Sequence, residues 1–202
     1  MGEKIKVNKQ STTKGFAVLS AAGFIVKFLS LLYIPFLGKI LGEAGLGVYY
    51  SAYNIFTYVY ILTNAGIPVA ISKIVSELIA LGNYKDAVKT FKIARFSLLV
   101  LGIVMSLLML ILVVPISNLT QSGSARLAIM ALAPTVLLTS VLSAYRGYFQ
   151  GRGNMTPTAV SQVFEQLANT VFSLIFAACF IKFGVAAGAA GGTVGKIGRA
   201  HV

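Results

Sequence analysis

Five long apolar blocks, separated by short segments that carry most of the charge, constrain this chain more than any other feature of its sequence. The blocks cover residues 16–41, 48–67, 96–116, 125–145 and 160–181. Each supplies the roughly 20 residues that a helix needs to cross a hydrocarbon core about 30 Å thick. Backbone groups in lipid must bond to one another, so each block is predicted to be a helix. The predicted fold class is an all-α integral membrane protein, a polytopic helix bundle.

The residue composition excludes an ordinary soluble domain. Hydrophobic residues make up 57% of the 202 residues and charged residues only 11%, whereas charged residues make up about 25% of a soluble domain. The formal net charge of +12 suggests nucleic acid, an anionic membrane surface or an acidic substrate as partner. Because the basic residues lie between apolar blocks and form no continuous face, we expect membrane lipids and no nucleic acid.

Lysine and arginine are distributed unevenly over the segments that join the blocks. The basic tail at residues 1–15 and the segments after the second and fourth blocks together hold eleven of these residues, and the other segments hold five. Lysine and arginine accumulate on the cytoplasmic side of membrane proteins. We therefore predict a multi-pass protein of the cell membrane whose N-terminus is cytoplasmic.

Residues 67–81 have apolar side chains at helical spacing and polar side chains on another face. This pattern predicts an amphipathic helix in the cytoplasmic interface of the membrane. Residues 82–83 are predicted to end it and to begin the next helix. The basic stripe that follows, at Lys85, Lys89 and Lys92, suits anionic lipid headgroups, and a plain positive anchor is the simpler alternative.

Lys27 lies eleven residues into the first apolar block, too deep for an ordinary anchor at a helix end. A charge near the bilayer centre costs at least ~2.5 kcal/mol on insertion scales. Such a side chain is expected to face a water-filled cavity or a partner, so Lys27 is a candidate for binding an anion inside the bundle. The alternative is a lysine whose stem reaches the membrane surface.

Two apolar blocks also carry polar stripes. Gln162, Glu165 and Asn169 lie at i, i+3 and i+7 in the fifth block and so share one helical face. Asn54 shares a face with tyrosine and threonine side chains in the second block. We expect these four residues to line a cavity. Interhelical hydrogen bonds that only hold the bundle together are the alternative.

The connector between the fourth and fifth blocks contains two arginines, several glycines and Pro157. Glycine and proline permit a tight, mobile turn. Arg146 and Arg152 are candidates for gripping phosphate or a carboxylate at a cytoplasmic gate. Glu165 could pair with either arginine or with Lys27.

Other chemistry is not indicated by the sequence. It contains no P-loop, no cluster of metal ligands, no paired carboxylates and no nucleophile with a base, so no enzyme, metal or cofactor is predicted. Residues 185–194 are rich in glycine and alanine, which suits close helix packing and the start of a sixth helix. Residues 197–202 match the translation of a common sequencing adapter, and we expect them to be an artefact.

Several segments together carry a family resemblance. They are Lys14-Gly-Phe, Lys27, Pro35-Phe-Leu-Gly-Lys-Ile-Leu-Gly-Glu-Ala-Gly-Leu-Gly-Val-Tyr, Gly66-Ile-Pro-Val-Ala-Ile-Ser-Lys and Arg146-Gly-Tyr-Phe-Gln-Gly-Arg-Gly-Asn-Met-Thr-Pro-Thr-Ala. This set resembles the polysaccharide-biosynthesis membrane proteins, in particular the stage V sporulation protein B branch. That group belongs to the multidrug/oligosaccharidyl-lipid/polysaccharide exporter superfamily, with the lipid II flippases and the MATE exporters.

The resemblance implies two pseudo-symmetric lobes of six helices and alternating access between them. Residues 16–194 would then form part of the N-terminal lobe of a MATE-like flippase, and the C-terminal lobe would be missing. It also implies a lipid-linked saccharide substrate in cell-wall, spore-cortex or polysaccharide synthesis, with Lys27 at the place of a basic cavity residue. An ion-coupled drug exporter of the MATE type and a non-transporting membrane scaffold are the alternatives. Neither a coupling ion nor coupling to the membrane potential can be assigned.

Overall fold

A computed structural model describes residues 11–64, 66–119 and 123–194. Most of the expected basic tail and the suspected artefact at 197–202 lie outside these ranges. The elements in chain order are α1 (Thr12–Asn64), α2 (Ile67–Ala80), α3 (Tyr84–Ile111), α4 (Val113–Leu119), the 3-10 helix η1 (Gly123–Ala125), α5 (Arg126–Gly151), α6 (Thr156–Phe180), the 3-10 helix η2 (Ile181–Phe183) and α7 (Val185–Val194). The described residues contain no strand, which confirms the predicted all-α class.

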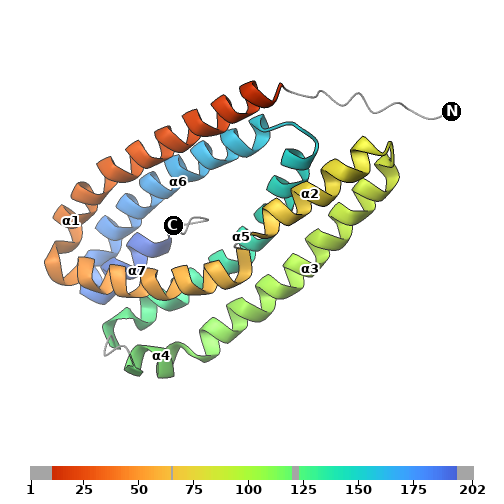
Figure 1. The fold of residues 1–202 in the computed structure, drawn as a ribbon. Helices are drawn as coiled ribbons and strands as arrows, with labels where there is room; N and C mark the ends of the chain where they lie inside the picture. Colours follow the sequence, from red (N-terminus) through yellow and green to blue (C-terminus); the bar gives the residue numbers. More distant parts are fainter. Residues whose placement is uncertain (1–10, 65, 120–122, 195–202) are drawn as a thin grey trace.

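The first element is a pair of helices joined by a sharp reversal. Gly42 has φ 67° and ψ 178°, a conformation outside the helical region. At this residue the chain turns back, so that arm 12–41 and arm 43–64 of α1 lie on opposite sides of the kink (Figure 1). Only glycine adopts such a backbone conformation without a steric penalty. A single residue therefore replaces a loop between the two arms.

Four helical stretches among the described residues are long and apolar enough to cross a membrane. They are Thr13–Ala80, Tyr84–Ile111, Gly123–Gly151 and Thr156–Phe183. The first stretch includes the reversal at Gly42, so each of its arms can count as a separate crossing. These stretches show a multi-pass membrane protein, and the count of five crossings stays a prediction.

Helix α3 begins twelve residues earlier than the apolar block at 96–116 and ends at Ile111. Its first turns carry the basic stripe of Lys85, Lys89 and Lys92, whose side chains are all exposed. Hydropathy detects only the part of a helix that is apolar enough for lipid. Helical hydrogen bonds continue into the polar segment because nothing there breaks them.

The turn between α2 and α3 is closed by glycine, as the sequence predicts. Gly82 has φ 75°, its N–H donates to Ile79 O at 3.0 Å, and the Asn83 N–H donates to Leu78 O at 2.8 Å. This pair of bonds is the Schellman arrangement that ends a helix at a left-handed residue. Helix α3 then begins at Tyr84, which confirms the predicted restart. The location of α2 in the membrane interface stays a prediction.

Helix α2 packs closely on α5 through two glycines. A β-carbon at Gly147 would lie 2.8 Å from both Ile71 Cβ and Pro68 O, and one at Gly151 would lie 2.7 Å from Ser72 O. Small residues let helix backbones approach within a membrane, where apolar contact alone does not favour protein over lipid. The buried face of α2, which includes Ile71, is therefore held against protein.

The short helix α7 packs against α1, α5 and α6. Its glycines and alanines at 188, 189, 191 and 192 are buried, and a β-carbon at Gly191 would lie 2.5 Å from Phe176 O. The Thr193 hydroxyl donates to Ala190 O at 2.7 Å. The expected start of a sixth helix is thus present over Val185–Val194.

The ends of the helices divide between the two ends of the bundle. The start of α1, the α2–α3 turn and the start of α6 gather at one end, at the upper right of Figure 1, and the kink of α1, α4 and the end of α6 gather at the other. The first end holds the segments that are rich in lysine and arginine. The positive-inside distribution therefore fits the three-dimensional arrangement, with the first end predicted to be cytoplasmic.

Replacing Gly147 by leucine is expected to lower the thermal stability of the protein, because the added side chain must push α2 away from α5. Overpacking of this kind costs about 1–3 kcal/mol. The measurement is the melting temperature of the detergent-solubilised protein by fluorescence-detected size exclusion. Gly23→Ala is the control, since a β-carbon added at Gly23 would meet no atom within 4 Å. Equal melting temperatures for both variants would contradict the packing argument.

Cysteine labelling is expected to place the two ends of the bundle on opposite sides of the membrane. Lys85 and Lys182 are both exposed, and Cys179 is the one cysteine of the chain. In a Cys179→Ala background, Lys182→Cys should react with an impermeant maleimide in intact cells. Lys85→Cys should react only after lysis, and the reverse pattern would overturn the predicted orientation.

Candidate functional site

A pocket of about 190 Å³ lies between the two arms of α1 and helix α6. Its lining residues come from all three segments and are polar or aromatic, apart from one isoleucine. They are Ser30, Tyr33, Ile34, Tyr49, Tyr50, Tyr53, Gln166, Asn169, Thr170 and Ser173. No lysine, arginine, aspartate or glutamate is among them. We call this the tyrosine pocket.

The wall of the tyrosine pocket is fixed by a hydrogen bond across the reversal at Gly42. The hydroxyls of Tyr33 and Tyr49 bond to each other, and both side chains are almost fully buried. The Tyr49 and Tyr53 rings lie nearly parallel, with centroids 6.3 Å apart. Buried tyrosines combine a large apolar ring with a hydroxyl that needs a partner. These contacts tie one arm of α1 to the other.

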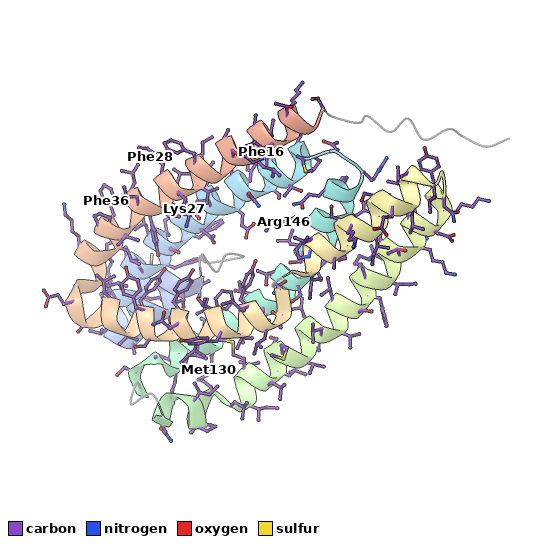
Figure 2. All side chains as sticks on the ribbon, in the orientation of Figure 1. Phe16, Lys27, Phe28, Phe36, Met130 and Arg146 are labelled. Atoms are coloured by element: carbon purple, nitrogen blue, oxygen red, sulfur yellow. The ribbon has the colours of Figure 1, made fainter. Side chains whose placement is uncertain are left out.

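Lys27 does not line the tyrosine pocket, but it lies on the same arm of α1 as three of the lining residues. It precedes Ser30 by three residues and Ile34 by seven, so the three residues occupy neighbouring positions on the first arm of α1. Figure 2 shows Lys27 on the side of α1 toward α6, whereas Phe28 and Phe36 project from the outer edge. The Lys27 side chain is exposed and has no ion pair with any residue that the structure describes.

Arg146 and Glu165 form a buried ion pair between α5 and α6. Their side chains are 12% and 8% exposed, and the buried Arg146 Nε has no hydrogen-bond partner among the described residues. One turn before Arg146, the Ser143 hydroxyl donates to Asn64 Oδ1 at 2.7 Å. The polar groups in this part of α5 are therefore used mainly to hold neighbouring helices.

The structure brings together only part of the predicted set. Asn169 is buried and lines the tyrosine pocket, and Gln162 is half-buried about two turns earlier on α6. Asn54 is exposed and does not line the pocket, although its neighbour Tyr53 does. The guanidinium of Arg152 lies over the Tyr148 ring, 5.5 Å from its centroid.

Sequence reasoning missed Tyr33, Ser30 and Ser173 as residues of the site. The signal that could have found them is the spacing of Tyr33 and Ser30 from Lys27, which places all of them within two turns of one helix. Ser173 follows Asn169 by one turn and so continues the polar stripe of the fifth block. The two apolar blocks at 16–41 and 48–67 predict a reversal between them, but not that the reversal occurs at the single residue Gly42 and sets Tyr49 against Tyr33.

The family model described as polysaccharide biosynthesis protein matches residues 12–197. The chain belongs to this family. Three curated proteins of Bacillus subtilis (strain 168) are similar to it. Stage V sporulation protein B is 34% identical over 94% of the chain, and the uncharacterized membrane protein YabM is 30% identical over 98%. Lipid II flippase MurJ is 27% identical over 80% of the chain.

The chain spans 37% of the length of the first two relatives and 31% of the third. No solved structure matches it significantly. Membership of the family confirms the resemblance seen in the sequence. It also agrees with the placement of the chain in the wider exporter superfamily.

Removing either partner of the buried ion pair is expected to destabilise the protein. Arg146→Met leaves a carboxylate, and Glu165→Leu leaves a guanidinium, in a site that water barely reaches. Breaking a buried pair in this way costs about 3–5 kcal/mol. Each single variant should melt at a lower temperature than the wild type, and the double variant should recover most of the loss. A double variant whose loss equals the sum of the two single losses would contradict the pairing.

Proposed function

We propose that the chain is part of a transporter that moves a lipid-linked saccharide precursor from the cytoplasmic to the outer leaflet. Membership of the polysaccharide biosynthesis family supports this proposal, as does the similarity to a protein whose name is lipid II flippase. The observation that carries it within this chain is Lys27. This lysine has no ion-pair partner among the described residues, and it lies in an apolar arm, one turn before the pocket residue Ser30.

The proposed role of Lys27 is to bind the anionic linkage of the precursor. A phosphate group that leaves water must find a compensating cation, because the Coulomb energy between opposite charges rises as the dielectric constant falls. An intramembrane lysine commonly serves as such a partner. Arg146 is less suited to this role in the described arrangement, since Glu165 already neutralises it.

Transport by this proposal requires the rest of a two-lobed protein. In transporters built from repeats, the substrate site lies near the bilayer midplane between two bundles, and rocking of the bundles exposes it to each side in turn. The described helices would contribute one wall of that site. The buried pair of Arg146 and Glu165 would keep α5 and α6 moving as one body during the rocking.

A lysine one turn from a pocket residue distinguishes the proposal from its alternatives. Cationic drugs would be repelled by Lys27, so a drug exporter of the MATE type fits the site less well. A membrane scaffold would not need a charge at this depth, and it would lose function through changes in exposed loops instead. Each alternative therefore predicts a different response to removal of this one charge.

Replacing Lys27 by alanine is expected to abolish transport, because the anionic group then loses its cation. The measurement is rescue of a cell-wall or spore-cortex defect in the native host, with membrane abundance followed by immunoblot. Lys27→Arg should retain most of the activity, since it keeps the charge.

Lys39→Ala is the matched control, because Lys39 is an exposed lysine near the C-terminal end of the same arm of α1. It should leave both activity and abundance unchanged. Full rescue by Lys27→Ala at normal abundance would reject the proposed role of the lysine and would favour the scaffold.

A further inference from the structure

We propose that the tyrosine pocket binds one neutral sugar ring of the transported precursor, while Lys27 holds the anionic linkage beside it. This inference rests on the proposed function and adds to it a specific site for the saccharide. Nothing in the family match assigns a ligand to these residues. Three properties indicate which ligand fits: the size of the pocket, the chemistry of its walls and its position relative to Lys27 on the helix.

The pocket has the size of a single ring. Its volume is about 190 Å³, and a protein cavity of about 150 Å³ holds one benzene molecule. A pocket for a larger ligand is usually at least about 300 Å³. One six-membered ring with its substituents therefore fits, whereas a disaccharide or a lipid chain would extend beyond it.

The walls of the pocket suit a neutral, polar ring. None of the ten lining side chains is a lysine, arginine, aspartate or glutamate, so no fixed charge attracts an ion. Tyr49, Tyr50 and Tyr53 supply aromatic surface, and Gln166 and Asn169 supply amides. An amide offers both a donor and an acceptor, as a sugar hydroxyl does. Most of the exposed wall is apolar and a few polar groups converge on it, as in sites that bind a small ligand.

Ser173 adds a hydroxyl to the wall of the pocket. Its side chain is fully buried and lines the pocket, next to the Tyr33 hydroxyl. A serine hydroxyl offers both a donor and an acceptor. A sugar hydroxyl that enters the pocket would find a hydrogen-bonding group at this position.

The position of the lysine fits a sugar that carries a phosphate linkage. Ser30 lines the pocket and follows Lys27 by three residues, which corresponds to a rise of about 4.5 Å along the helix. A lysine one turn from a lining residue has a side chain long enough to reach an anionic group that is attached to the bound ring. Phe24 and Leu31, which flank Lys27 at i−3 and i+4, are 74% and 69% exposed and provide apolar surface for a lipid chain.

The test compares two lipids that differ only in the sugar. Undecaprenyl diphosphate and undecaprenyl diphosphate that carries N-acetylglucosamine are added to the protein in phosphatidylcholine nanodiscs, and affinities are measured by native mass spectrometry. The experiment uses the full polypeptide that its native host produces. The wild type should bind the lipid with the sugar at least tenfold more tightly than the lipid without it.

Two pocket variants should lose this preference without losing the diphosphate. Tyr33→Phe removes one hydroxyl and keeps the ring, and Asn169→Leu removes the amide. Each should reduce the preference to below threefold and leave the affinity for undecaprenyl diphosphate unchanged. Tyr58→Phe is the matched control, because Tyr58 is 71% exposed and lies outside the pocket. It should keep the tenfold preference.

The outcomes separate this inference from the proposed function. Equal affinities of the wild type for the two lipids, or an unchanged preference in both pocket variants, would overturn the sugar site and leave the transport proposal standing. If the protein binds neither of the two lipids, both the sugar site and the proposed transport function are overturned. Loss of affinity for both lipids in Lys27→Ala, with the preference lost only in the pocket variants, would support the two adjacent sites.

Discussion

The arrangement of the site depends on one backbone reversal. The two arms of α1 are joined at one end of the bundle, where the chain reverses its direction. Gly42 reduces the connection to a single residue with a positive φ of 67°. The two arms of α1 consequently meet close to the kink, and the bond between Tyr33 and Tyr49 closes the space between them. Without the reversal, the tyrosine pocket would have no second wall.

Close packing of neighbouring helix backbones holds most of the rest of the bundle together. Helices in a membrane gain little from hiding apolar surface, so they associate through packing and hydrogen bonds. Glycines on α5 allow α2 to pack closely against it, and a glycine on α7 allows the same for α6. The buried pair of Arg146 and Glu165 adds a polar contact between α5 and α6. These contacts leave the outer faces of the bundle apolar and exposed, as lipid requires.

Much of the fold could be predicted from the sequence because the requirement for helices in lipid is so strict. The apolar blocks, the glycine stop at residue 82 and the helical character of 67–81 all follow from length and periodicity. Helix α3 extends beyond its block because polar helix ends carry no hydropathy signal. The glycine-rich helix at Val185–Val194 was expected from its composition.

The site could be predicted only in part. Lys27 and Asn169 were singled out because a charge or an amide is conspicuous in an apolar block, and of these two Asn169 lines the tyrosine pocket. Tyrosine and serine are common in membrane helices, so Tyr33 and Ser173 were not conspicuous. Asn54 lies on the same helix as several pocket residues but does not line the pocket. Which residues of this helix face the pocket depends on the orientation of one arm of α1 relative to the other. Pairing of Glu165 with Arg146 was one of three options that the sequence left open.

The short connection at Gly42 also fixes the register of the two arms. Tyr33 and Tyr49 are separated by 16 residues, and a helix of 3.6 residues per turn rotates by about 100° for each residue. Adding or removing one residue between them would rotate the following ring by about that angle and take Tyr53 with it. The number of residues between the two tyrosines therefore determines whether their hydroxyls can meet. A family member with a different number would need another contact to hold the two arms together.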